Sequence, residues 1–267
     1  MSKAADILVI DDEQVVIDAV TKICALDGYT VDSALGVSSA LEKLTKNYYH
    51  IIICDIMMPD GDGFQILEHL NKSNNDTVII MMTGYSTVEN AVKSLYMGAV
   101  DFIPKPFTVD ELLGSVFRSN KFISIKKRQV ELSKSGGSEL AYVNCPAKYL
   151  RLGQSTWVYY EKEGSVLIGI SDLFIKTINS VKEINLFQID DEIAQGISCA
   201  QIISADDRIH KVLSPVSGRI VEVNESIKSN ISLLEKDPYF AGWIYRLIPN
   251  DYDFESKLLV PCSSDRW

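Results

Sequence analysis

Residues 51–63 read Ile51-Ile-Ile-Cys-Asp-Ile-Met-Met-Pro-Asp-Gly-Asp-Gly63, an apolar run that reaches an acid and then passes into a turn. Four apolar residues in succession predict a strand that is buried on both faces, as in a parallel sheet covered by helices. The run stops at Asp55, so this carboxylate is expected at the carboxyl end of the strand. Doubly wound sheets collect their functional groups at that end.

Similar apolar runs alternate with helical patterns on both sides of this stretch. Strands are predicted from Thr30 onward and at residues 7–10, 51–54, 78–82 and 100–103. Helices are predicted at residues 15–26, 38–44, 63–70, 88–97 and 109 to about 118, with a continuation of the last one to residue 132 left open. Five such units favour an α/β fold of the flavodoxin-like, doubly wound type with a five-stranded parallel sheet.

The polar residues that follow these strands form one predicted site. Asp11 and Asp12 follow the first strand, Asp55 the third, Thr83 the fourth and Lys105 the fifth. In a doubly wound sheet, the carboxyl ends of the first, third, fourth and fifth strands are neighbours. The side chains that follow these strands should therefore converge. Three carboxylates in one cleft repel one another and invite a hard cation such as Mg²⁺. Such a cation would offset the charge of an incoming phosphoryl group, and Asp55 at the tip of its strand is placed as the nucleophile that accepts it. Lys105 supplies a fixed positive charge near the phosphoryl oxygens, and the hydroxyl of Thr83 can donate to one of them.

Four motifs in this half of the chain resemble those of the response-regulator receiver domain of two-component signalling. They are Ile10-Asp-Asp-Glu13, residues 54–63, Met82-Thr-Gly-Tyr85 and Asp101-Phe-Ile-Pro-Lys-Pro-Phe107, within a resemblance over residues 5–118. The resemblance implies that Asp55 accepts phosphate from a sensor histidine kinase. It also implies that Asp11, Asp12, Asp55 and the main-chain carbonyl of Met57 bind Mg²⁺.

The same resemblance implies a conformational switch formed by Thr83 and Phe102. Many receivers have Tyr at the position of Phe102, so the ring is kept here but its hydroxyl is lost. Met57 and Tyr85 correspond to positions that flank the route of hydrolytic water in receivers. Two bulky side chains there predict slow loss of the phosphoryl group. The Lys105-Pro106 bond is a candidate for the cis isomer.

The second half of the chain has a different pattern and predicts a mostly-β domain. Short strands are expected at residues 156–160, 165–170, 183–187, 199–204, 211–213, 218–223 and 242–248, with helices near 171 and at 227–234. Between the halves, Ser133-Lys-Ser-Gly-Gly-Ser138 has the composition of a flexible joint. We therefore expect a first domain at 1–122, a helical extension and linker at 123–139, and a second domain at 140–267.

The second domain resembles the H protein of the glycine cleavage system, a lipoyl/biotinyl carrier with a barrel-sandwich hybrid fold. The resemblance rests on residues 166–172, on Ser214-Pro-Val-Ser-Gly-Arg-Ile-Val-Glu-Val-Asn-Glu225 and on residues 235–243. H proteins carry lipoate on a lysine eight residues before the proline of the Ser-Pro-Val-Ser-Gly motif. Asp207 stands there, and a carboxylate cannot form that amide, so no lipoate is expected. We expect Lys211 to face solvent and His210 to be an exposed polar residue.

Composition limits the function classes. The 267 residues carry a net charge of -10, and the pI is near 4.8. The one positive stretch, residues 121–139, has 5 Lys/Arg against 2 Asp/Glu and is too short for a DNA-binding module. No apolar run approaches the ~20 residues that span a bilayer, and no signal peptide pattern begins the chain. With five cysteines and no metal-knuckle spacing, a cytoplasmic protein without nucleic-acid or membrane partners is expected.

The sequence thus predicts a response regulator, not an enzyme beyond slow autodephosphorylation. Its second domain would be a non-lipoylated output that binds an unknown protein target, and a homodimer of the phosphorylated form is left open. One alternative is a lipoyl-type carrier component under phosphorelay control. Another is a transcriptional regulator, against which the acidic output and the lack of a helix-turn-helix pattern count.

Overall fold

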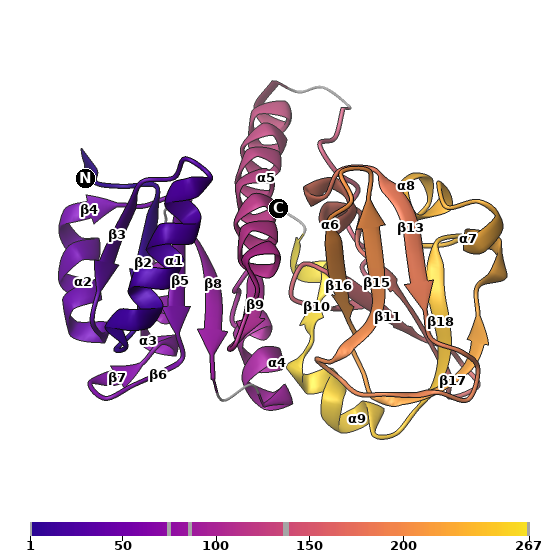
Figure 1. The fold of residues 1–267 in the computed structure, drawn as a ribbon. Helices are drawn as coiled ribbons and strands as arrows, with labels where there is room; N and C mark the ends of the chain where they lie inside the picture. Colours follow the sequence, from indigo (N-terminus) through magenta and orange to yellow (C-terminus); the bar gives the residue numbers. More distant parts are fainter. Residues whose placement is uncertain (1, 74–75, 85–86, 136–138, 266–267) are drawn as a thin grey trace. The chain divides into compact units, whose positions relative to one another are not determined.

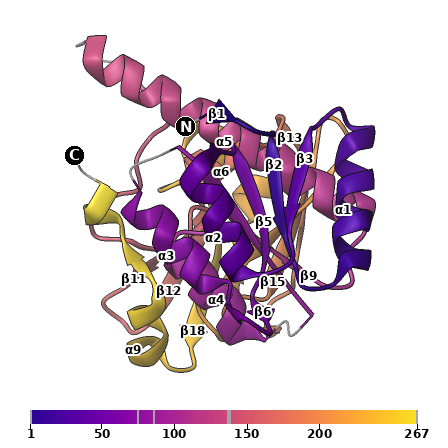
Figure 2. The ribbon, with the colours of Figure 1, turned by 90° about the vertical axis from the view of Figure 1, so that its left-hand side faces the viewer.

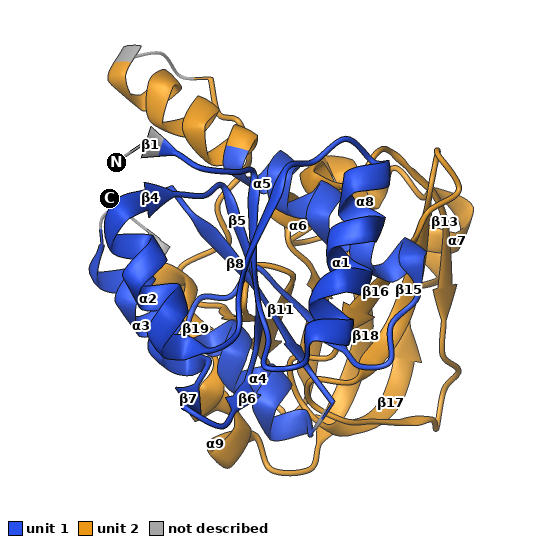
Figure 3. Ribbon diagram, turned by 60° about the vertical axis from the view of Figure 1, so that its left-hand side comes forward, with its two compact units in different colours: residues 1–123 blue, residues 124–267 orange. Residues whose placement is uncertain are grey.

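The computed structural model describes residues 2–73, 76–84, 87–135 and 139–265. The chain forms two compact units, residues 1–123 and residues 124–267, which Figure 3 colours separately. Tyr85 and residues 136–138 of the expected linker lie outside the described residues. Within the described residues, no helix combines the length and apolar character that crossing a membrane requires.

The first unit is built on the predicted five-stranded parallel sheet (Figure 1). Its strands lie in the order β3 (Val31–Ala34), β2 (Ile7–Ile10), β5 (Ile51–Asp55), β8 (Val78–Thr83) and β9 (Asp101–Pro104). The helices are α1 (Gln14–Leu26), α2 (Val37–Lys46), α3 (Phe64–Lys72), α4 (Val88–Tyr96) and α5 (Val109–Ser135). The doubly wound α/β fold is therefore confirmed, and α5 continues past its expected end as one unbroken helix.

Helices cover both faces of this sheet, which explains why its strands are apolar throughout. Ile7 pairs with Ile51, and their side chains belong to a core cluster that includes residues of α1 and α5. Leu8 pairs with Ile52, and these side chains face a second cluster with α2 and α3. Figure 2 shows α1 on one side of the strands and α2 and α3 on the other. Successive residues of a strand point to opposite faces, so both positions must be apolar.

Two pairs of very short strands were not predicted. β1 (Ser2–Lys3) pairs with β4 (Asn47–Tyr48), and β6 (Met57–Met58) forms a hairpin with β7 (Gly61–Asp62). A strand of two residues carries no readable alternation of apolar and polar positions, so the sequence pattern could not reveal it. The β6–β7 hairpin directly follows Asp55 and shapes the loop beside it.

The second unit is mostly β, as predicted, and contains two antiparallel sheets. One has the order β14 (Glu192–Ile193), β17 (Gly218–Val223), β18 (Trp243–Pro249), β12 (Val166–Ile170), β11 (Thr156–Tyr160), β10 (Leu150–Leu152) and β19 (Val260–Pro261). The other has the order β13 (Val181–Leu186), β15 (Ser198–Ser204) and β16 (Ile209–Leu213). Its helices are α6 (Asp172–Thr177), α7 (Glu225–Ser229), α8 (Leu233–Lys236) and α9 (Tyr252–Glu255), followed by the 3₁₀ turns η1 (Ser256–Leu258) and η2 (Cys262–Asp265).

The helix predicted at residues 227–234 is instead two short helices. Asn230 ends α7 with φ -143° and ψ 82°, a conformation that cannot continue a helix. The core of this unit surrounds the buried Trp157, whose indole N–H donates to the carbonyls of Ile170 and Pro238 at 3.1 and 3.2 Å. The backbone of Gly169 packs closely against the indole, and residue 169 must be glycine because a Cβ there would lie 2.3 Å from the ring.

Candidate functional site

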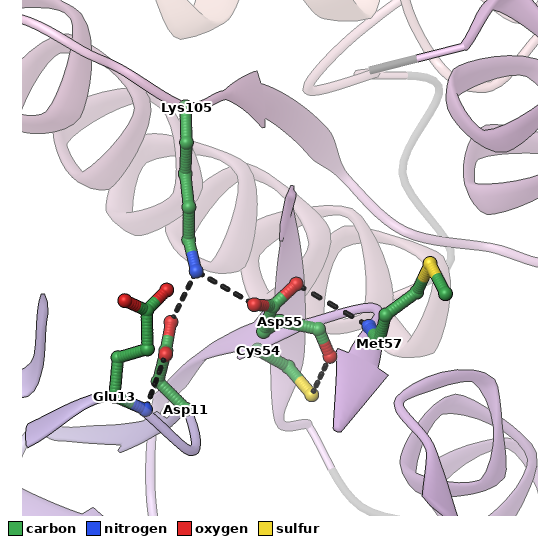
Figure 4. A network of polar contacts seen from close by, with 6 residues as sticks. All are labelled: Asp11, Glu13, Cys54, Asp55, Met57 and Lys105. Carbon is green, nitrogen blue, oxygen red and sulfur yellow. Dashed lines mark hydrogen bonds and ion pairs between the residues drawn. The ribbon is translucent and has the colours of Figure 1, made fainter. Parts of the chain in front are cut away.

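Asp11, Asp55 and Lys105 meet at the carboxyl edge of the parallel sheet (Figure 4). Carboxylate oxygens of Asp11, Asp12 and Asp55 lie within 4.8 Å of one another. The Lys105 ammonium lies 2.7 Å from a carboxylate oxygen of Asp11 and 2.6 Å from one of Asp55. Its backbone N–H donates to the carbonyl of Thr83 at 2.8 Å, so the threonine at the end of β8 adjoins the same group. The Lys105-Pro106 bond is cis.

Burial sharpens the electrostatics of this group. Asp11 is fully buried, Asp55 is 6% exposed, and Asp12 is exposed. Burial raises the pKa of Asp11, although the hydrogen bond from Lys105 opposes this. Burial also disfavours the ammonium of Lys105, but its hydrogen bonds to Asp11 and Asp55 outweigh that cost and raise its pKa. The lysine therefore stays charged, and one positive charge faces three carboxyl groups.

The donor atoms fit a hard divalent cation. The carboxylates of Asp11, Asp12 and Asp55 supply oxygen ligands, and among the described residues they are the one cluster of acids, histidines or cysteines arranged for a metal. The main-chain carbonyl of Met57 is the fourth oxygen assigned by resemblance, and the N–H of Met57 donates to Asp55 at 3.3 Å. Mg²⁺ favours this all-oxygen chemistry and, when bound, offsets the negative charge of a phosphoryl group.

The loop that carries Met57 is fixed at several points. The N–H of Gly63 donates to the carbonyl of Ile56 at 2.8 Å. The carboxylate of Asp60, between β6 and β7, accepts the N–H groups of Val37 and Ser38 at 3.0 and 2.9 Å. These bonds, the one from Ser38 first, lower the pKa of Asp60 and cap the amino end of α2. The hairpin is thus anchored to a neighbouring helix.

The backbone at Gly63 packs closely against the end of β5, since a Cβ at residue 63 would lie 2.1 Å from the carbonyl oxygen of Asp55. We expect Gly63→Ala to displace this strand end, to lower the free energy of unfolding by about 1–3 kcal/mol, and to slow phosphorylation. Thermal denaturation measures the first effect. Gly114→Ala in α5 is the matched control, since its Cβ would meet Arg118 at an ordinary 3.5 Å. Equal stability of Gly63→Ala and wild type would contradict the prediction.

Binding of Mg²⁺ should stabilise the protein. At a concentration of one hundred times Kd, the gain in free energy of unfolding is about 2.7 kcal/mol, and chelation by EDTA should remove it. Asp11→Asn should lose most of this gain because a charged ligand is replaced by a neutral one. Asp18→Asn, at an exposed position of α1, should keep it. A melting curve of Asp11→Asn that responds to Mg²⁺ like the wild type would argue against this site.

The two proposed switch residues occupy different surroundings. Thr83 is fully buried at the end of β8. Phe102 is half-buried on β9 and packs against the core cluster that includes residues of α2 and α3. The sequence did not predict which residues of α5 contact β9. The preceding residue, Asp101, accepts the hydroxyl of Ser115 at 2.6 Å and forms an ion pair with Arg118, both from α5.

The prediction of slow phosphate loss is addressed for one residue only. The side chain of Met57 is 55% exposed beside Asp55, whereas Tyr85 lies outside the described residues. The prediction therefore stays a prediction.

Comparison with protein families assigns both halves of the chain. Residues 7–117 match the response regulator receiver domain, and residues 148–264 match the glycine cleavage H-protein. The chain joins a receiver domain to a glycine cleavage H-protein domain. Both resemblances inferred from the sequence are thereby confirmed, and residues 148–264 are called the H-like domain below.

Similar curated proteins match the receiver half. The transcriptional regulatory protein DltR of Streptococcus agalactiae is 33% identical over 127 residues, which are 47% of this chain and 57% of that protein. The regulatory protein AtoC of Escherichia coli is 36% identical over 121 residues, 45% of this chain and 26% of that protein. The chain therefore spans about half, or less, of these relatives. Among solved structures, a glycine cleavage system H protein from Mycobacterium marinum has 24% sequence identity to this chain and a TM-score of 0.37. The match covers 39% of this chain and 86% of that protein.

In the H-like domain, Asp207 lies in the turn between β15 and β16. It is exposed, and its φ of 60° is in the left-handed region, which a short polar side chain tolerates. Its carboxylate pairs with the ammonium of Lys182 at 2.5 Å. The pairing of β13 with β15 shifts register between Val181 and Glu183. Lys182 is the extra residue of this bulge, and sequence reasoning missed that it reaches the hairpin tip.

The expectation for His210 was wrong. Its side chain is only 1% exposed, because alternate residues of β16 face inward and His210 is one of them. Its Nε2 lies 3.0 Å from the hydroxyl of Ser204, which itself donates to Asp206 at 2.5 Å. Ser204 Oγ also lies 3.2 Å from the carbonyl of Arg208, and the direction of its bond with His210 follows the imidazole tautomer. The next residue, Lys211, is exposed as predicted.

Proposed function

We propose that this chain is a response regulator that a sensor histidine kinase phosphorylates on Asp55. The observation that carries the proposal is the geometry at the sheet edge. Asp55 ends its strand among two other acids, and the ammonium of Lys105 lies within hydrogen-bonding distance of its carboxylate. In the transfer, a carboxylate oxygen of Asp55 bonds to phosphorus while the bond from phosphorus to the histidine nitrogen of the kinase breaks.

The roles of the surrounding residues follow from their positions. Asp11, Asp12, Asp55 and the carbonyl of Met57 would hold Mg²⁺. Lys105 is placed to turn from the carboxylates to a phosphoryl oxygen, which would stabilise the added charge. Thr83 would donate its hydroxyl to the same group, and Phe102 would move with it as the second switch residue.

We further propose that the H-like domain is a protein-binding output that is not lipoylated. Asp207 takes the position of the lipoyl lysine, and its carboxylate cannot form the amide that holds lipoate. The matches to DltR and AtoC cover only 57% and 26% of those proteins. The transcriptional role in the name of DltR is therefore not carried over to this chain. The target, a homodimer of the phosphorylated form, the cytoplasmic location and the absence of enzyme activity stay predictions, as do the domain limits at 122 and 140.

A binding comparison tests the proposed gating. The phosphorylated wild type and Asp55→Asn should bind the target of the H-like domain with affinities that differ by roughly fivefold or more, the lower range of allosteric coupling. Proteins captured by each form are identified by mass spectrometry, and the affinities are then measured with the purified partner. Phosphorylated Asp18→Asn should behave as the wild type. Identical partners and affinities for both forms would refute phosphorylation-gated binding.

A further inference from the structure

Helix α5 belongs to both compact units, since it runs from Val109 to Ser135 and the boundary lies at residue 123. Its first half is part of the receiver core, where Leu112 and Val116 are fully buried. The same half binds β9 through the contacts of Ser115 and Arg118 with Asp101. β9 leads directly into Lys105, which holds Asp55. A change at the phosphorylation site therefore has a short route to this helix.

The second half of α5 is attached to the segment of residues 139–143, which we call the strap. The ammonium of Lys126 lies 3.3 Å from the hydroxyl of Tyr142, and Arg128 forms an ion pair with Glu139 at 3.0 Å. The side-chain carbonyl of Gln129 accepts the N–H of Ala141 at 2.8 Å. Three residues on one helical stretch thus hold three residues of the strap.

The other end of the strap is bound to buried groups of the H-like domain. The N–H of Val143 donates to the carboxylate of Asp172 at 2.6 Å, and the hydroxyl of Tyr239 donates to the carbonyl of Val143 at 2.9 Å. That hydroxyl also accepts the N–H of Asp172 at 3.1 Å. Asp172 is only 1% exposed. A buried carboxylate depends on its few hydrogen bonds, so a displaced strap would disturb the start of α6.

One side chain of the strap is buried. Tyr142 is 9% exposed, whereas the side chains of Leu140 and Val143 are exposed. The hydroxyl of Tyr142 is the group that Lys126 of α5 contacts. A movement of the helix would therefore act directly on the buried residue of the strap.

We propose that the strap transmits the phosphorylation state of the receiver from α5 to Asp172 and Tyr239 of the H-like domain. This inference rests on the proposed function, because it requires phosphorylation of Asp55. It adds the element that joins the second half of α5 to the H-like domain, through contacts at both of its ends. A spatial route alone does not establish coupling, so the response of the H-like domain must be measured.

The test is amide hydrogen exchange on the full chain with and without a small-molecule phosphodonor and Mg²⁺. In the wild type, exchange in residues 141–143 and 172–177 should change on the order of fivefold or more. In the triple variant Lys126→Ala, Arg128→Ala and Gln129→Ala, this change should vanish while the change in residues 101–105 persists. Alanine favours the helix, so α5 should be retained. The control is Glu131→Ala with Lys134→Ala, at exposed positions of the same helical stretch.

The outcomes separate the two proposals. A triple variant whose H-like domain still responds to phosphorylation overturns the strap and leaves the proposed function intact. The strap also fails if Asp55 is phosphorylated in the wild type, shown by intact mass, but residues 141–143 and 172–177 do not respond. A wild type that takes up no phosphoryl group refutes the proposed function itself and the inference with it.

Discussion

Asp55→Asn should take up no phosphoryl group under conditions that label the wild type fully. The substitution keeps the size of the side chain but replaces a carboxylate oxygen by a neutral amide, which is a much weaker nucleophile. It also removes one of the three charges that would hold Mg²⁺. The measurement is intact mass after incubation with acetyl phosphate and Mg²⁺, and then with a phosphorylated histidine kinase.

Two controls separate the nucleophile from its surroundings. Asp18→Asn lies on the exposed side of α1 and should be labelled like the wild type. Lys105→Met leaves the nucleophile in place but removes the ammonium bound to Asp11 and Asp55, so labelling should be slower, not absent. Full labelling of Asp55→Asn would move the phosphorylation site elsewhere.

Asp207→Lys should convert the H-like domain into a substrate for lipoate ligase, whereas the wild type should stay unmodified. β15 and β16 form the hairpin that presents this position, and residue 207 carries a carboxylate in place of an amine. The left-handed backbone at residue 207 costs a lysine roughly 1–2 kcal/mol, which a folded domain can tolerate. A new lysine would also face the ammonium of Lys182, so the double variant with Lys182→Ala should be modified more efficiently. Intact mass detects one added lipoyl group.

Lipoylation should depend on where the lysine stands, so the control is a lysine introduced at a different position of the same hairpin. Gln201→Lys lies on an exposed position of β15 and should remain unmodified. Lys182→Ala alone should also remain unmodified. If the wild type gains a lipoyl group, then another amine, Lys182 or Lys211, is the acceptor. The proposal of an unmodified output would then be wrong.

Much of the receiver site was predictable, because in a parallel sheet the order of residues along a strand determines which side chains lie at its carboxyl end. An apolar run of four or five residues indicates a strand buried on both faces, and the next polar residue must lie at its carboxyl end. That rule placed Asp11, Asp55, Thr83 and Lys105 at one edge of the sheet, where the structure has them. The rule needs no knowledge of side-chain contacts, only of strand order.

The residues that were missed depend on contacts between distant parts of the chain. His210 was assigned to an exposed tip because the strand was expected to begin at residue 211, whereas β16 begins at Ile209. Successive residues of a strand face opposite sides, so His210 points inward beside the exposed Lys211. Lys182 reaches the tip through a bulge, which leaves no local sequence signal. The strap contacts join residues 126–129 to residues 139–142 across the Ser/Gly segment, where no periodic pattern exists.

The hairpin β6–β7 has a consequence for the entropy of ion binding. Asp60 ties this hairpin to α2, and the N–H of Gly63 ties its base to Ile56. The main chain at Met57 is therefore ordered before any ion arrives. A carbonyl on a free loop would lose backbone freedom worth roughly 1–2 kcal/mol per residue on binding. Folding has already ordered this backbone, so Mg²⁺ should bind with little further loss of chain entropy.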